Sequence, residues 1–224
     1  MSELNQKPIE RVWDRYIDEP FRSQVSKQDN PPQVTKNSAL IIIDLYQLVY
    51  EGGNKPVSEL IDQFPASCGE YAYRAIEPIN RLITLFRDKD LPLFFSTKDF
   101  ARSQRIGNAT HRPRNAPKAE DYELFPAIDF RATDELIKKL RASVFFDTEL
   151  QSILAANKTE RIFIAGESTS GCIRASVIDG FSLGYQVCVV EDCVFDQNRV
   201  SHAINLYDIQ HKYGQVTELS KLEP

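Results

Sequence analysis

One cysteine of this chain stands where a reactive thiol is expected. Cys172 lies in GESTSGCIRASVIDGFSLGY, residues 166–185, after the apolar run RIFIA at 161–165 and before apolar residues at helical spacing. The run predicts a buried strand, and the spacing predicts a helix that ends near Gly184, so that Cys172 falls in its first turn. A helix N-terminus favours a thiolate and lowers a cysteine pKa, which makes a nucleophile. The alternative is an unreactive buried thiol, and this segment alone favours neither.

Two charged residues elsewhere supply the groups that a thiol nucleophile needs. Asp44 ends the apolar run ALIIID, and Lys139 ends the segment DELIKK. A carboxylate can take the thiol proton and hand it to a leaving amine, and a lysine can stabilise a thiolate. Taken singly, Asp44 is better explained as the cap of a turn, and Lys139 as surface charge beside Lys138.

Strands and helices alternate along the part of the chain that carries these residues. Apolar strands are expected at 39–44, 91–97, 134–139, 161–165 and 186–190, with a possible edge strand at 215–218, and helical spacing occurs at 76–86, 148–154, 173–181 and 200–211. Apolar strands without the alternation of a half-exposed sheet predict a three-layer α/β/α fold, with a mainly parallel, doubly wound sheet of about six strands. Because ligands bind beyond the carboxyl ends of such strands, Asp44, Lys139 and Cys172 are expected at one edge.

Composition excludes several classes of partner. The 224 residues carry a net charge of -5 and contain no apolar run that would span a bilayer, so we expect one domain and no membrane partner. The basic cluster at 102–114 is interrupted by glycine, asparagine and proline and is interpreted as a solvated loop, so no nucleic-acid partner is expected. The charged N-terminus lacks a secretory signal, and the four cysteines lack metal-site spacing, which predicts free thiols in the cytoplasm.

The first part of the chain differs from the rest. Residues 1–36 are polar and proline-containing and are interpreted as an N-terminal arm and linker, whereas residues 37–224 form the predicted domain. Trp13, Tyr16 and Phe21 are aromatic exceptions on this arm. They predict docking on the chain's own domain or on a neighbouring subunit, and a simple surface wrap is an equal alternative.

The three reactive segments together resemble the isochorismatase-like cysteine hydrolases. IIIDLY contains Asp44, KLRASVFFDTEL begins with Lys139, and GESTSGCI contains Cys172, in the order and spacing of that family. The similarity covers about residues 39–216. Within the family, EDCVFDQNRVSHAINLYDIQHKYGQV at 191–216 is most similar to the branch of N-carbamoylsarcosine amidase and maleamate amidohydrolase.

The resemblance implies an amidohydrolase that cleaves a small amide or carbamoyl compound through a thioester and releases ammonia. Asp44, Lys139 and Cys172 would be its catalytic residues. The backbone N–H groups of Ser168 and Cys172 would form the oxyanion hole, with a cis peptide bond between Glu167 and Ser168. The resemblance also implies a homo-oligomer, either a dimer or a tetramer.

Metal-dependent relatives use an aspartate and histidines after the second strand. Here that region reads FFSTKDFARSQ, with Asp99 but no histidine before His111, so neither a metal nor another cofactor is expected.

The substrate-binding residues follow the resemblance less closely. Gln197 occupies the place of an arginine that would hold a substrate carboxylate, and Arg199 lies two residues further on, so neutral and carboxylate-bearing amides both remain open. Thr169 is a further candidate for substrate binding, although Thr169 and Ser170 are better explained as helix caps.

Three other functions compete with the leading interpretation. Hydrolysis of maleamate or of another amide or ureide would use the same residues. Vinyl-ether hydrolysis of the isochorismate type is disfavoured, because it proceeds without a thiol. A non-catalytic binding protein that retained the fold would not require Asp44, Lys139 and Cys172 together.

Overall fold

A single parallel sheet organises the computed structural model, which describes residues 11–26, 32–106, 111 and 115–223. Within these residues the sheet has six strands in the order β3-β2-β1-β4-β5-β6, and every pairing is parallel. The strands are β1 (Ser38–Ile43), β2 (Leu93–Lys98), β3 (Glu135–Lys139), β4 (Arg161–Glu167), β5 (Gln186–Phe195) and β6 (Gln215–Thr217). The helices are α1 (Glu19–Ser26), α2 (Val57–Leu60), α3 (Glu70–Asp88), α4 (Phe100–Ile106), α5 (Leu150–Ala156), α6 (Arg174–Ser182) and α7 (Arg199–Lys212).

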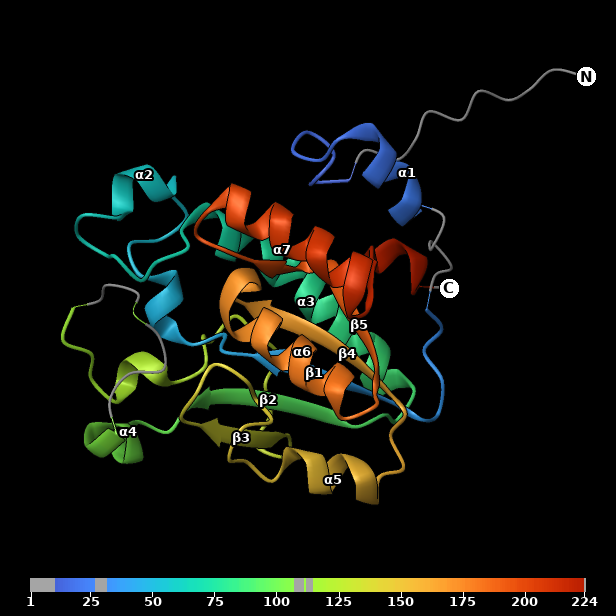
Figure 1. The fold of residues 1–224 in the computed structure, drawn as a ribbon. Helices are drawn as coiled ribbons and strands as arrows, with labels where there is room; N and C mark the ends of the chain where they lie inside the picture. The colour runs from blue at the N-terminus through green and yellow to red at the C-terminus, as the bar shows by residue number, and fades with distance from the viewer. Residues whose placement is uncertain (1–10, 27–31, 107–110, 112–114, 224) are drawn as a thin grey trace, which may run out of the picture.

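The strand order reverses in the middle of the sheet (Figure 1). From β1 the chain proceeds outward through β2 to β3, and then returns to β4 and proceeds outward through β5 to β6. The connections that follow β1 and β4 therefore lead toward opposite edges of the sheet. In parallel sheets this topological switch point is where ligands bind. The predicted doubly wound α/β fold is confirmed.

Both faces of the sheet are buried, because consecutive residues of each central strand point into different cores. In β1, Ala39, Ile41 and Ile43 belong to the core beneath α5, α6 and α7, whereas Leu40 and Ile42 belong to the core beneath α3. Helices therefore cover the sheet on two sides (Figure 1). This explains why the strand sequences are apolar throughout and do not alternate.

Three element boundaries differ from the prediction. Helix α3 begins at Glu70, ahead of the predicted helical spacing at 76–86, and continues through Pro78. Strand β5 extends from 186 to Phe195, past the predicted end at 190, with a shift in its register with β4. Helix α6 begins at Arg174, because residues Thr169–Ile173 form a separate π-helical turn. Cys172 lies in that turn and not in the first turn of an α-helix.

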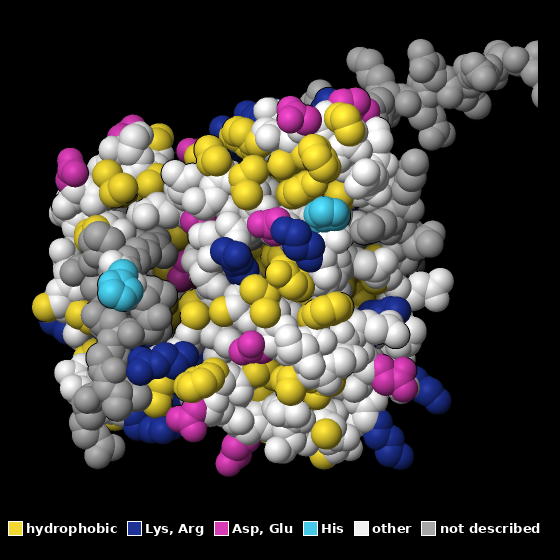
Figure 2. All heavy atoms as spheres, viewed as in Figure 1, with side chains coloured by type: hydrophobic (Ala, Val, Ile, Leu, Met, Phe, Trp, Pro, Cys, Tyr) yellow, Lys and Arg dark blue, Asp and Glu magenta, His cyan; other side chains and the backbone are white. Residues whose placement is uncertain are grey.

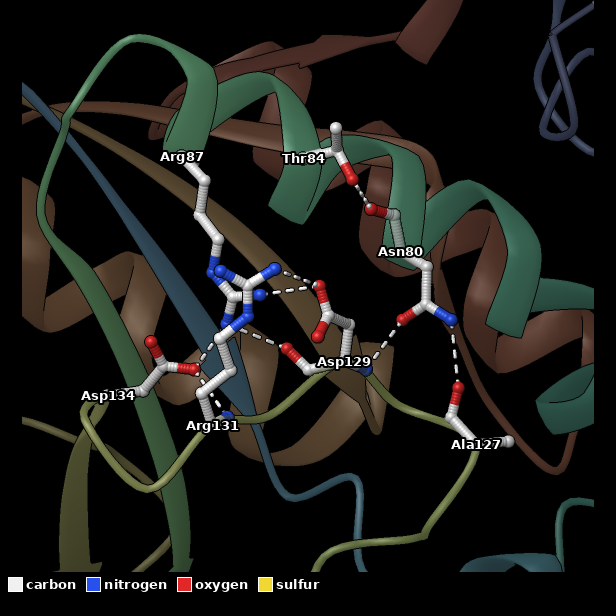
Figure 3. Close-up of polar contacts among 7 residues, drawn as sticks. All are labelled: Asn80, Thr84, Arg87, Ala127, Asp129, Arg131 and Asp134. Carbon is white, nitrogen blue, oxygen red and sulfur yellow. Dashed lines mark hydrogen bonds and ion pairs between the residues drawn. The ribbon is translucent and has the colours of Figure 1, made fainter.

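Side chains near the end of α3 form ion pairs and hydrogen bonds with the segment that leads into β3 (Figure 3). Arg87 forms ion pairs with Asp129 and Asp134 and also donates to the Asp129 carbonyl at 2.8 Å. Asn80, two turns earlier, accepts a hydrogen bond from the Asp129 backbone N–H at 2.9 Å. The Arg87 side chain is only 12% exposed, so these ion pairs hold the start of β3 more firmly than an exposed pair would.

The N-terminal segment docks on its own domain. Trp13 is 2% exposed and packs edge-on against Tyr207 of α7, and Arg11 forms an ion pair with Glu191 at 3.1 Å. Tyr16 and Phe21 remain 39% and 51% exposed. Other parts of the predicted arm, at 1–10 and 27–31, and part of the basic cluster, at 107–110 and 112–114, lie outside the described residues.

The helices are too short or too polar to act as membrane spans in the described parts of the chain.

Candidate active site

Asp44, Lys139 and Cys172 meet at the carboxyl edge of the sheet. Asp44 follows β1, Lys139 ends β3, and Cys172 lies in the turn after β4. The Lys139 Nζ atom is 2.6 Å from Asp44 Oδ2 and donates to Cys172 Sγ at 3.5 Å. One ammonium group thus bridges the carboxylate and the thiol. Lys138 is exposed, so strand alternation selects Lys139 of the two lysines.

Burial and ion pairing together fix the charge of Lys139. Its side chain is 4% exposed, and that of Asp44 is 2% exposed. Burial lowers the pKa of Lys139, but the Asp44 carboxylate and the Cys172 thiol raise it, and the net pKa lies above its ordinary value. The raised pKa favours the charged form of Lys139.

The surroundings of Cys172 favour the neutral form of its thiol. Burial raises its pKa, and the Asp44 and Glu167 carboxylates raise it further, whereas Lys139 lowers it. The balance lies above the ordinary value, so the prediction of a lowered pKa is wrong for this state. The physical reason is that desolvation and two carboxylates outweigh one ammonium group. A thiolate must form by proton transfer, and Asp44 is the adjacent base.

Ser96 orients the carboxylate and was not found from the sequence. Its hydroxyl donates to Asp44 Oδ1 at 2.9 Å, and its carbonyl accepts from the Asp44 backbone N–H at 3.2 Å. The side chain lies in β2 and is fully buried. A polar residue inside the apolar run LPLFFST is the signal that could have revealed it.

The turn that carries Cys172 is held by a cis peptide bond, backbone hydrogen bonds and a close contact at a glycine. The peptide bond between Glu167 and Ser168 is cis, the conformation that the family resemblance implied. The Ser168 carbonyl accepts from the backbone N–H groups of Gly171 at 2.9 Å and Ile173 at 3.2 Å. At Gly171 a Cβ atom would lie 2.6 Å from the Ser168 hydroxyl, so only glycine fits without a shift of that side chain.

Thr169 and Ser170 hold the turn to the neighbouring strand rather than capping a helix. Thr169 is fully buried, and its hydroxyl donates to the Phe195 carbonyl at 3.1 Å and lies 2.8 Å from His202 Nδ1. The Ser170 backbone N–H and hydroxyl both donate to Asp196 Oδ2, at 2.8 and 2.7 Å. Neither side chain caps the turn or α6, so the capping prediction is wrong. Thr169 and Ser170 bind Phe195 and Asp196, at the end of β5 and directly after it, instead of backbone N–H groups of their own turn.

A cavity of about 260 Å³ opens beside Cys172. Its walls include Asp44, Lys139 and Ser168, two further cations, Lys98 and Arg141, and also Gln197. Thr169 is not among its lining residues.

The two predicted substrate-binding residues after β5 are separated. The Gln197 amide donates to the carbonyls of Pro65 at 3.0 Å and Ser67 at 2.8 Å, so both of its N–H groups are used to fix a loop. Arg199 lines a different cavity, and the structure does not bring it together with Cys172. The sequence could not reveal that these two residues face different cavities. Gln197 lies in the short loop between β5 and α7, and Arg199 directly follows that loop.

Among the described residues, no group of three or more His, Cys, Asp or Glu side chains is arranged to hold a metal ion.

The fold and the arrangement at the switch point define a family. Residues 38–221 match the isochorismatase domain, and the chain belongs to the isochorismatase family. The family resemblance seen in the sequence is thereby confirmed.

Particular relatives share shorter regions. Maleamate amidohydrolase of Pseudomonas putida is 42% identical over 90 residues, which are 40% of this chain and 42% of that protein. N-carbamoylsarcosine amidase of an Arthrobacter species is 27% identical over 153 residues, 63% of this chain and 57% of that protein. The chain thus spans about half the length of the curated relatives it matches. An isochorismatase family protein from Burkholderia thailandensis shares the fold, with a TM-score of 0.72 and 21% identity, covering 86% of this chain and 97% of that one.

Proposed function

We propose that this protein is a cysteine amidohydrolase that cleaves the carbon–nitrogen bond of a small amide or carbamoyl compound. The observation that carries the proposal is the contact of Lys139 with both Asp44 and Cys172 in the wall of a cavity. The amidohydrolase names of the relatives agree with it. A thiol, an adjacent carboxylate and an ammonium group can serve amide hydrolysis at neutral pH as nucleophile, base and stabilising cation.

In the first half of the proposed reaction, Asp44 takes the thiol proton while Cys172 Sγ bonds to the substrate carbonyl carbon. The electron pair of the carbonyl moves to its oxygen, where the backbone N–H groups of Ser168 and Cys172 stabilise it. The carbonyl then re-forms and the carbon–nitrogen bond breaks. Asp44 delivers the proton to the leaving nitrogen, and ammonia departs. Lys139 stabilises the negative charge on the sulfur as the thiol proton is removed.

In the second half, water hydrolyses the thioester. Asp44 takes a proton from the water as its oxygen attacks the thioester carbon, and the carbon–sulfur bond breaks. The proton passes to the sulfur of Cys172, and the acid product leaves with the original thiol restored.

The cations of the cavity favour a substrate that carries a carboxylate. Lys98 and Arg141 line the cavity in addition to Lys139, on the same walls as Glu167 and Asp196. The Gln197 donors are used elsewhere, so the glutamine at this position does not argue for a neutral substrate. An Arg guanidinium binds a carboxylate with two parallel hydrogen bonds. The proposed substrates are therefore carboxylate-bearing amides of the maleamate or N-carbamoyl amino acid type.

An ammonia-release screen tests the substrate class. We expect release from maleamate or N-carbamoylsarcosine and much less from the neutral amide nicotinamide. Arg141→Gln should raise KM for the carboxylate substrate by about tenfold and change kcat little. Faster release from nicotinamide, or an unchanged KM in the variant, would contradict a carboxylate-bearing substrate.

Acid quenching during turnover tests the mechanism. Mass spectrometry of the peptide that contains Cys172 should show the added acyl group of the thioester. Turnover without any such adduct, together with activity that is retained in Cys172→Ala, would exclude the proposed mechanism.

The cellular setting is also a proposal. All four cysteines are free and buried, which suits a reducing compartment, and we propose the cytoplasm. We further propose a homo-oligomer, because Phe21, Phe146 and Phe181 are each at least half exposed. Sedimentation equilibrium should give a multiple of the chain mass; a monomer at all concentrations would contradict it.

A further inference from the structure

A second cavity lies next to the catalytic one. It measures about 390 Å³ and lies between the N-terminal segment, α3, the end of β5 and the start of α7. This volume is in the range of small-molecule sites, which is roughly 300–1,000 Å³. Asp196 lines both cavities, so the two share a wall. The reaction proposed above uses none of the residues that are specific to the second cavity.

Both arginines and aspartates line this cavity. Three arginines line it, Arg15, Arg74 and Arg199, on a chain whose net charge is -5. Arg74 pairs with Glu70 on the surface of α3. Arg15 and Arg199 form no ion pair with any residue that the structure describes. Arg15 and Arg199 thus line the cavity without an ion pair to any described carboxylate.

The two aspartates of the cavity are already bound by hydrogen-bond donors. Asp196 is 8% exposed and accepts from the Ser170 backbone N–H, the Ser170 hydroxyl and the Asn198 backbone N–H. Asp192 accepts from the Leu219 backbone N–H at 2.7 Å. Their charge is therefore partly neutralised by fixed dipoles, which leaves the guanidinium groups available to an anion.

The remaining walls are apolar and aromatic. Ala75 and Pro78 come from α3, Val194 and Phe195 from β5, and the rings of Tyr16 and Tyr71 complete the lining. Figure 2 shows hydrophobic side chains gathered over the N-terminal segment and the adjacent part of α7, beside charged ones. A ligand that matches these walls has a flat apolar body and one negative group.

We propose that the second cavity binds a small organic carboxylate with an aromatic or otherwise flat apolar body, and that Arg15 and Arg199 bind its carboxylate. The ligand would also reach the supports of the catalytic turn. His202 lines the cavity and lies 2.8 Å from the Thr169 hydroxyl, and Asp196 holds Ser170. Thr169 and Ser170 begin the turn that ends with Cys172 and Ile173.

Calorimetric titration of the full chain with benzoate tests the site, with benzamide as the neutral probe of the same shape. Both titrations use a Cys172→Ala background, so that the result does not depend on the proposed hydrolysis. We expect one benzoate per chain with Kd on the order of 1 mM and about tenfold weaker binding of benzamide. Arg15→Gln/Arg199→Gln should weaken benzoate binding about tenfold and leave benzamide unchanged.

Two control variants separate binding at this site from a general effect of charge and from binding in the catalytic cavity. Arg131→Gln/Lys158→Gln makes the same change in net charge on exposed residues outside both cavities, and Arg141→Gln alters the catalytic cavity. Neither should change benzoate binding. The proposal is overturned by absent benzoate binding, by equal binding to Arg15→Gln/Arg199→Gln, or by binding that only Arg141→Gln removes. A smaller particle mass for Arg15→Gln/Arg199→Gln in sedimentation equilibrium would also overturn it, because a second copy would then fill the cavity.

Discussion

Cys172 and Cys188 are both buried thiols, and burial raises the pKa of both. Cys188 is 1% exposed and lies in β5, among the apolar side chains beneath α3. Cys172 is 7% exposed, lines a cavity and accepts a hydrogen bond from Lys139. A raised pKa therefore does not distinguish the core thiol from the proposed nucleophile in this protein. Access to a cavity and an adjacent base and cation do.

Alanine substitution of the two cysteines should give the largest contrast. Cys172→Ala should reduce ammonia release by more than about 10³-fold, because the nucleophile is lost. Cys188→Ala should leave kcat within about twofold, because that thiol faces only the core. Steady-state rates on the best substrate of the screen measure both. Comparable losses in the two variants would remove the distinction.

Lys139→Met tests whether the cation beside Cys172 also stabilises the fold. It leaves the buried Asp44 carboxylate without its ion pair and should lower the free energy of unfolding by about 3–5 kcal/mol. Urea denaturation measures the loss. Asp44→Asn/Lys139→Met should recover much of it, because no buried charge then lacks a partner.

Arg74→Met is the matched control for an exposed ion pair, since the Arg74 side chain is 70% exposed. It should cost far less than Lys139→Met. Equal costs would show that burial adds nothing to the Lys139–Asp44 pair.

Serine substitution compares the surroundings of the two thiols. Cys188→Ser places a hydroxyl in an apolar core and should lower the free energy of unfolding by about 1–3 kcal/mol. Cys172→Ser should cost less, because Lys139 and Asp44 offer hydrogen bonds to the hydroxyl. Urea denaturation of both variants gives the difference, and a larger cost at Cys172 would contradict this account.

Alkylation by iodoacetamide tests the sign of the electrostatic effects. The thiolate is the reactive form, so a raised pKa makes alkylation of Cys172 slow at neutral pH and faster as the pH rises. The Asp44 carboxylate contributes to the raised pKa, so Asp44→Asn should lower the pKa and speed alkylation severalfold at pH 7. Lys139→Met should slow it, because Lys139 lowers the pKa.

Peptide mass spectrometry follows the label, with Cys188 in the same chain as the internal control. Cys188 should stay unlabelled in each variant, because it is buried away from the cavity. Slower alkylation of Cys172 in Asp44→Asn would reverse the assigned sign.

The main features of the site could be predicted because they follow from local patterns. Apolar runs located β1 and β4, and the rule for parallel sheets placed the residues that follow them at one edge. The family resemblance selected Lys139 rather than Lys138, and the structure agrees, because Lys139 is buried and Lys138 is exposed in β3. These inferences require no knowledge of distant partners.

The remaining details depend on contacts between segments far apart in the chain. Thr169 binds the Phe195 carbonyl and lies against His202, Ser170 binds Asp196, and Gln197 binds a loop more than a hundred residues earlier. Each of these side chains also has a plausible local role, which the sequence favoured. The end of β5 was missed for a related reason, because two acidic residues interrupt its apolar run.

Gly166 of β4 lies in close backbone contact with the end of β1, the strand that leads to Asp44. Its φ is +113°, and a Cβ atom at this position would lie 2.0 Å from the Ile43 carbonyl oxygen, so the backbones of β1 and β4 touch there. Ile43 precedes Asp44, and Gly166 pairs with Ile43 in the sheet. The segments that carry the proposed base and the proposed nucleophile therefore both begin at this backbone contact. A displacement of the sheet at this contact therefore moves the backbone before Asp44 and the backbone before the Cys172 turn together.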